Sequence, residues 1–154
     1  MPLLNYTTTI EAVKTAGEIQ GILAAHGAKS ILTDYAEDGT VEAIAFKIRT
    51  PQGDIGIRLP INPGAVLKVL TSQYNSGKVQ RRYVNRAQAV RVAWRIVKDW
   101  VQAQMAILET EMVKMEQIFL PYAITKDGQT VYELFEQSKF KMLGEGDNAP
   151  PKHE

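Results

Sequence analysis

The chain has 154 residues, of which 45% are hydrophobic and 23% charged, and it contains no cysteine. Its size fits one globular domain, and the lack of cysteine excludes disulfide frameworks, thiolate metal sites and cysteine nucleophiles. The formal net charge of +1 conceals a segregation, because residues 78–98 carry seven Lys or Arg side chains and no Asp or Glu.

The first predicted elements are a helix and three strands. Thr8 and Glu11 have the spacing of a capping box and Gly27 suits a helix C-terminus, so residues 10–26 are expected to be helical. The expected buried stripe of this helix is Val13, Ala16, Ile19, Ile22 and Leu23. The predicted strands are residues 29–36, 40–50 and 55–61. Turn residues separate them, which indicates an antiparallel meander with one apolar face and one flat, partly basic face.

Helices dominate the second half of the chain. They are predicted over residues 62–74, 86–110, 112–122 and 130–140. Asn62 followed by Pro63 is typical of a helix start, with Asn as the N-cap and Pro in the first turn, and Asn85 is expected to cap the longest helix. The element order predicts an α+β domain with an N-terminal helix, a three-stranded antiparallel meander, and a helical C-terminal half packed on the sheet.

The first 75 residues share the order helix, three strands, helix with double-stranded-RNA-binding domains. Such domains begin their second helix with a basic, alanine-containing segment, whereas the corresponding helix here begins NPGAVLKV. The likeness is therefore one of topology, and topology alone does not assign a function.

The longest helix divides into an apolar stripe and a cationic face. Trp94 and Trp100 belong to the stripe and are expected to anchor the core. Arg91, Arg95 and Lys98 share a face at helical spacing, and we expect this face to turn away from the core.

The ends of the chain predict neither a secretory signal nor a membrane span. The N-terminal stretch MPLLNYTTTIEAVK lacks a basic region followed by an apolar run, and nowhere do 18 apolar residues follow one another. We expect a single cytoplasmic domain over residues 1–143. Residues 144–154 are polar and rich in Gly and Pro, which predicts a flexible tail.

Catalytic and metal-binding motifs are missing from the sequence. His26 and His153 are the only histidines, so we expect neither a Ser-His-Asp triad nor a metal site built from several histidines. Around Gly77 the P-loop pattern fails, because Ser72 replaces its first glycine and Val79 its final Ser or Thr. The remaining carboxylates of interest flank a predicted turn: Asp34, Glu37, Asp38 and Glu42. We expect no catalytic residue, metal or cofactor, and hence no enzyme.

The basic block predicts an anion-binding surface. Lys78, Arg81 and Arg82 precede the N-terminus of the longest helix, where cations oppose the helix dipole unless an anion is bound. Tyr83 could stack on a base or fill the core. The predicted phosphate-binding or anion-binding residues are Lys78, Arg81, Arg82, Tyr83, Arg86, Arg91 and Arg95, with Lys47, Arg49 and Arg58 as a secondary basic face of the sheet. The structural alternatives are a solvated helix face and internal salt bridges to the acidic C-terminal third.

Two segments of the chain read TPQGDIGIRLP and RRYVNRAQAVRVAWRIVKDWVQAQMAILETEMVKMEQIFLPYAITKDGQTVYE. In these segments, and over most of residues 5–136, the chain resembles a group of small proteins carried by phages and prophages. That group brings no established activity, catalytic residue or cofactor. The resemblance implies only a context, in which such proteins serve phage DNA metabolism or neutralise host defences.

Two functional hypotheses follow. The first is a nucleic-acid-binding accessory protein that contacts phosphates and reads shape or single strands instead of sequence. The second is an anti-defence inhibitor or sponge that captures a host protein or a small anionic signal nucleotide in a compact pocket, which could sit at the interface of a homo-oligomer. Net charge separates them slightly, because a pI near 7.9 is low for a general DNA binder and the acidic C-terminal third would repel DNA unless it faced away.

Overall fold

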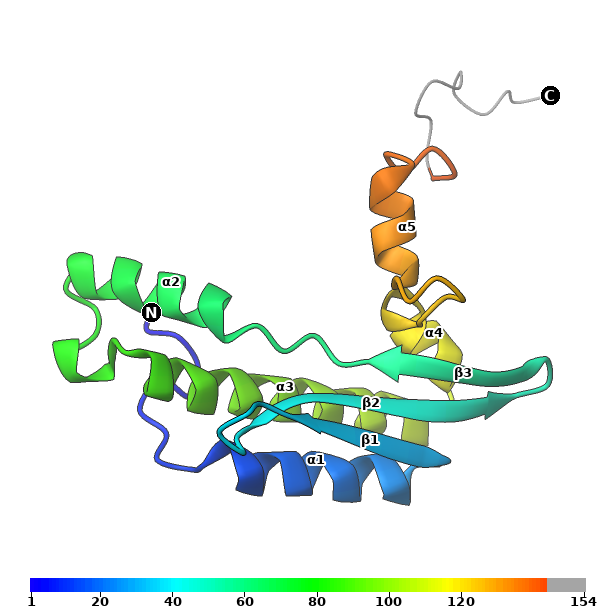
Figure 1. The fold of residues 1–154 in the computed structure, drawn as a ribbon, viewed down its shortest axis with the longest axis horizontal. Helices are drawn as coiled ribbons and strands as arrows, with labels where there is room; N and C mark the ends of the chain where they lie inside the picture. Colours follow the sequence, from blue (N-terminus) through cyan, green and yellow to red (C-terminus); the bar gives the residue numbers. More distant parts are fainter. Residues whose placement is uncertain (144–154) are drawn as a thin grey trace.

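The strands form an antiparallel meander in the order β1-β2-β3, as the sequence predicts. The computed structural model describes residues 1–143 (Figure 1). Its elements are α1 (Ala12–Ala25), β1 (Ser30–Tyr35), β2 (Val41–Thr50), β3 (Gly53–Arg58), α2 (Pro63–Asn75), the 3-10 turn η1 (Arg81–Tyr83), α3 (Arg86–Glu109), α4 (Met115–Phe119), the 3-10 turn η2 (Leu120–Tyr122) and α5 (Val131–Gln137). This order confirms the α+β class. The predicted tail, residues 144–154, lies outside the described residues.

One face of the sheet carries the core. Ile44 and Phe46 of β2 are buried, whereas Lys47 and Arg49 are exposed, which is the alternation of a half-buried strand. α1, α3 and α4 contribute side chains to the core on the buried face, and the Trp94 side chain of α3 is only 1% exposed. The prediction that Trp94 anchors the core is therefore confirmed. The opposite face is exposed at Leu32, Lys47 and Arg49, whereas the segment after η2 covers part of β3, where Ile124 lies 3.7 Å from the position that a Cβ of Gly56 would take.

Local cap residues set most of the helix ends. The side chains of Asn62 and Asn85 accept N–H bonds from the first turns of α2 and α3, and Gly27 follows α1 with a positive φ of 99°. The predicted capping box of Thr8 and Glu11 is wrong. α1 begins directly after Glu11, and in residues 1–143 the Glu11 side chain makes no capping hydrogen bond.

The buried face of α1 differs from the predicted stripe. Val13 is 67% exposed, so its placement in the stripe is wrong. The buried residues of α1 are Ala12, Thr15, Ala16, Ile19 and Leu23. α1 packs against α3 as well as β2, and its buried face is therefore centred on Ala12, Ala16 and Leu23, with Val13 at its outer border.

The C-terminal elements close one edge of the sheet. Ala123 pairs with Ile57 of β3, and the Ile124 N–H donates to the Gly56 carbonyl over 2.7 Å. The predicted helix 112–122 begins late, because a turn follows α3 and α4 starts only at Met115 before it continues into η2. The predicted helix 130–140 ends early, because a turn follows Gln137. α5 projects away from the layer formed by α1, α3 and the sheet (Figure 1). Within residues 1–143, no helix has both the length and the hydropathy that crossing a bilayer requires.

Candidate nucleic-acid interface

The structure separates the seven cations of residues 78–98 into two groups. α1 and α3 run parallel, so acidic side chains of α1 face the middle of α3. Arg91 Nη1 lies 3.5 Å from Glu11 Oε1, and Arg95 pairs with the Glu18 carboxylate and donates to Thr15 Oγ1 over 3.3 Å. The Arg95 side chain is only 13% exposed. The expectation that this face turns to solvent is wrong for Arg95, because α1 covers it.

The acidic partners of these arginines come from the N-terminal helix. Internal salt bridges to the acidic C-terminal third were the structural alternative, and Arg91 and Arg95 instead use Glu11 and Glu18. Lys98 lies 3.9 Å from the carboxylate of its neighbour Asp99. Internal pairing therefore accounts for these three cations of the block.

The remaining four cations are exposed on the connection between α2 and α3. We call Lys78, Arg81, Arg82 and Arg86 the basic loop. None of the four makes an ion pair with any residue in the described part of the chain. Gly77, with a φ of 78°, ends α2, and the buried side chain of Val79 anchors the connection to the body. The anchored turn holds the charged side chains outward.

Asn85 joins the basic loop to the N-terminus of α3. Its side-chain oxygen accepts the Gln88 N–H over 2.8 Å, and its amide donates to the Arg82 carbonyl over 3.0 Å. Arg86 occupies the first position of α3, and its Nη1 lies 3.8 Å from the position that a Cβ of Gly64 would take. Arg86 is thus close to the N-terminal turns of both α2 and α3, whose partial positive charge favours anions.

Tyr83 packs against the N-terminal segment. Its ring meets the Tyr6 ring edge-to-face, with centroids 5.2 Å apart. The Arg82 guanidinium carbon lies 4.8 Å from the centre of the same ring. Of the two roles considered for Tyr83, packing matches this geometry, and the ring supports Arg82 by a cation–π contact.

A polar cleft of about 400 Å³ adjoins the basic loop. Its lining residues are Thr7, Thr8, Thr9, Glu11, Arg82, Tyr83, Gln88 and Arg91. We call it the threonine cleft. The buried Gln88 side chain donates to the carbonyls of Tyr6 and Thr8 over 2.8 and 2.9 Å, and its oxygen accepts from Arg91 Nη2 over 2.8 Å. Gln88 therefore fixes both the threonine segment and the Arg91 guanidinium.

Gln88 and the three threonines were not predicted from the sequence as site residues. The only sequence signal for them was a run of hydroxyl side chains before the first helix, at residues 7–9. Their contact with α3 joins residues about 80 positions apart, and local patterns carry no information on such pairing.

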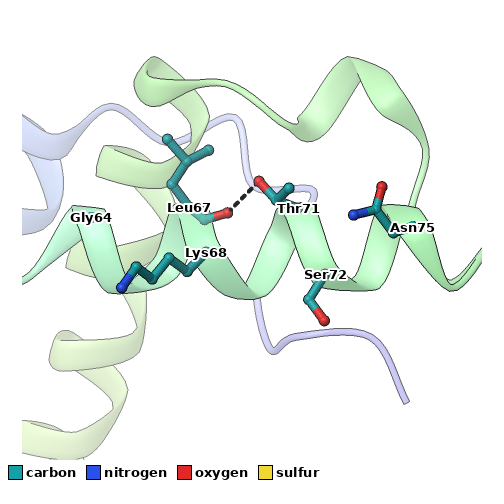
Figure 2. Close-up of a pocket in the computed structure, with 6 residues that line it drawn as sticks. All are labelled: Gly64, Leu67, Lys68, Thr71, Ser72 and Asn75. Carbon is teal, nitrogen blue, oxygen red and sulfur yellow. Dashed lines mark hydrogen bonds between the residues drawn. The ribbon is translucent and has the colours of Figure 1, made fainter.

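An open groove runs along α2, and its lining is mostly apolar with a few polar side chains. It has a volume of about 500 Å³ and is lined by Gly64, Leu67, Lys68, Thr71, Ser72 and Asn75 (Figure 2). The Thr71 hydroxyl donates to the Leu67 carbonyl over 2.8 Å. Lys68 is exposed, and it makes no ion pair among residues 1–143. Lys68 is not among the residues predicted from the sequence.

The secondary basic face of the sheet is partly neutralised. Arg49 lies 3.8 Å from Asp54, which also accepts from Lys29 over 2.8 Å. The hydrogen bond from Lys29 lowers the pKa of Asp54 below its ordinary value. Arg58 donates to the Gly128 carbonyl over 3.2 Å. The β2–β3 turn lies at the opposite end of the molecule from the α2–α3 connection (Figure 1), so the predicted basic face and the basic loop do not form one continuous surface.

The described part of the chain contains no candidate metal site, because no three His, Asp or Glu side chains lie close enough together there to bind an ion. His26 bonds the Ile22 carbonyl and the Glu109 carboxylate, each over 2.8 Å. Comparisons with protein-family models, curated proteins and solved structures found no match. A functional assignment therefore has to rest on the residues of this chain.

Proposed function

We propose that this chain is a non-catalytic nucleic-acid-binding accessory protein that contacts phosphates through the basic loop. The observation that carries the proposal is the division of the cationic block. Three cations are held by neighbouring carboxylates, whereas Lys78, Arg81, Arg82 and Arg86 are exposed and lack an ion pair within residues 1–143. Cations beside helix N-termini are unfavourable in the free protein by some tenths of a kcal/mol each, and bound phosphates remove this cost.

The proposed binding mode is sequence-independent. The basic loop offers charge, and the neighbouring groove along α2 offers hydroxyl and amide side chains, all of which contact phosphate and sugar without reading bases. Four phosphate contacts correspond to a modest salt dependence, with a log–log slope of about −3.6 for duplex DNA and about −2.8 for single strands.

The biological setting is proposed from the resemblance of residues 5–136 to small phage and prophage proteins. In that setting the chain acts in the host cytoplasm on phage nucleic acid. No step of the proposal requires a cofactor or a chemical reaction.

Fluorescence anisotropy with labelled single-stranded and duplex DNA at about 50 mM salt tests the proposal. The wild-type chain is expected to bind both. Lys126→Gln/Lys141→Gln is a matched control, since it removes two exposed cations away from the basic loop, and it should bind as wild type does. Arg82→Gln/Arg86→Gln should weaken binding strongly. Equal losses in both variants would mean that net charge matters and the basic loop does not.

The threonine cleft favours a second candidate, the capture of a small anionic nucleotide. Its volume of about 400 Å³ falls in the range of small-ligand sites, and Arg82 and Arg91 both line it. In this reading the chain is an anti-defence sponge. Protein purified without nuclease should then release a small nucleotide, seen as a raised A260/A280 ratio and identified by mass spectrometry. Released polynucleotide would instead support the first candidate.

A further inference from the structure

β1 is the open edge of the sheet. On the other side, residues 123 and 124 bond to the outer edge of β3 through the Ala123–Ile57 bridge and the Ile124–Gly56 hydrogen bond. Within residues 1–143, β1 is paired only with β2. A row of unpaired peptide groups along a strand is a template for another strand.

The pairing pattern shows which peptide groups of β1 point outward. The Leu59 N–H donates to the Ile44 carbonyl over 3.1 Å, which makes Ala45 and Arg58 a non-hydrogen-bonded pair. Ala45 therefore directs its own N–H and carbonyl toward its partner on β1, Leu32. Peptide groups alternate along a strand, so those of Ile31 and Thr33 point away from the sheet.

This edge is only lightly protected against pairing, by the charge of Asp34 and by a register irregularity between Asp34 and Tyr35. Residues 30–35 read SILTDY, without the Lys, Arg or Pro that commonly blocks an edge strand. Leu32 is 62% exposed on the open face, and Tyr35 is 59% exposed. The edge combines outward peptide groups with uncovered apolar area.

We propose that β1 binds β1 of a second copy of this chain in antiparallel orientation, with the two-fold axis at Leu32. Ile31 of each copy then lies opposite Thr33 of the other, and each pair exchanges two hydrogen bonds. The outward groups of Ile31 and Thr33 are all used. The two sheets become one continuous six-stranded sheet with an isologous interface.

Side-chain complementarity identifies the occupant as a second copy. In this register Leu32 meets Leu32, and Ser30 of each copy faces Asp34 of the other on the open face of the sheet. Asp34 is exposed and has no ion pair among the described residues. Lys47 is the β2 neighbour of Ser30, it is exposed, and it too makes no ion pair within residues 1–143. Pairing the two edges brings this carboxylate and this ammonium together across the interface.

α1 leaves room for the second copy. The Gln20 side chain donates to Thr33 Oγ1 over 2.7 Å, which places that side of α1 next to β1. The exposed residues on the same side are Val13, Gly17, Gly21 and Ala24. A Cβ at Gly17 or Gly21 would have no neighbour within 4 Å in residues 1–143. Such small side chains let two helices approach closely, so the α1 helices of the two copies can lie beside each other beneath the joined sheet.

Mass measurement gives the first test. The wild-type chain is expected to have twice its 17.2 kDa mass by light scattering at high micromolar concentration. Leu32→Lys places a charge on an exposed position of the edge and should give a folded monomer, with the melting temperature that the wild-type chain has at dilutions where it is monomeric. Val69→Lys also places a charge on an exposed apolar position, on α2, and should remain a dimer. A monomeric wild-type chain overturns the proposal.

Cysteine cross-linking tests the register, and the natural chain has no cysteine to interfere. In the proposed dimer the two Leu32 Cα atoms are about 4.5 Å apart, as in any non-hydrogen-bonded antiparallel pair, so Leu32→Cys should form an intermolecular disulfide on mild oxidation. Ser30→Cys is the control, because the two copies of residue 30 lie far apart in this register. A dimer in which Ser30→Cys cross-links and Leu32→Cys does not would contradict the proposed pairing.

Discussion

Removing Arg81 and Arg82 should impair binding without harming the fold. Both side chains are exposed and lack ion pairs within residues 1–143, so Arg81→Ala/Arg82→Ala leaves no carboxylate without its partner. A charge-assisted contact to phosphate contributes about 1.5–3 kcal/mol. Two lost contacts therefore correspond to a weakening of at least about 100-fold in DNA affinity. The free energy of unfolding should stay nearly constant, because removing two cations near helix N-termini offsets the loss of the cation–π contact between Arg82 and Tyr83.

Arg95→Ala is the matched control and should have the opposite pattern, with lower stability and nearly unchanged DNA affinity. Arg95 is mostly buried and holds both Glu18 and Thr15, so its loss should lower the free energy of unfolding by about 1–3 kcal/mol. DNA affinity should change little, because this guanidinium is engaged by α1. Urea unfolding and DNA anisotropy on the same preparations separate the two effects. The reasoning is refuted if the Arg81/Arg82 variant is clearly less stable than wild type, or if Arg95→Ala is the variant that loses binding.

Three further outcomes test the fold. Trp94→Ala should cost about 3–5 kcal/mol and lower the melting temperature sharply, since this side chain is fully buried; an unchanged melting curve would contradict the core assignment. Asn85→Ala should cost about 1 kcal/mol in urea unfolding by removing the cap of α3, with no loss expected from Asn75→Ala. The hydrogen bond to Glu109 raises the pKa of His26 above its ordinary value of 6.5. His26 therefore contributes stability that is fully present below this ordinary value and is lost as pH rises through the higher pKa of the folded state. The melting-temperature difference between wild type and His26→Gln should therefore be larger at about pH 5.5 than at about pH 8.5, and equal differences would be inconsistent with the His26–Glu109 contact.

The fold was largely predictable because its signals are local. Asn62 and Asn85 mark the helix starts, and the alternation of apolar residues along β2 marks the buried face of the sheet. Errors arose where one element touches two others. Val13 belongs to an apolar stripe by spacing, yet α1 packs against both α3 and the sheet, and the buried face is rotated away from it.

The candidate site was only partly predictable, since charge on a helix face does not reveal what lies opposite. Lys78, Arg81 and Arg82 were found because a turn residue and a helix cap surround them. The pairing of Arg95 with Glu18 joins residues 77 positions apart, and it depends on α1 and α3 running parallel, which no local pattern specifies. The same holds for Gln88, whose partners are backbone carbonyls of the N-terminal segment.

The salt dependence of DNA binding tests the central claim most directly. The basic loop is proposed to neutralise about four phosphates, so the logarithm of the association constant of the wild-type chain for duplex DNA should fall with log salt at a slope of about −3.6. The slope for Arg81→Ala/Arg82→Ala should be shallower by about 1.8. A wild-type slope near zero, or no binding at about 50 mM salt, would contradict the assignment of the basic loop as a phosphate-binding surface.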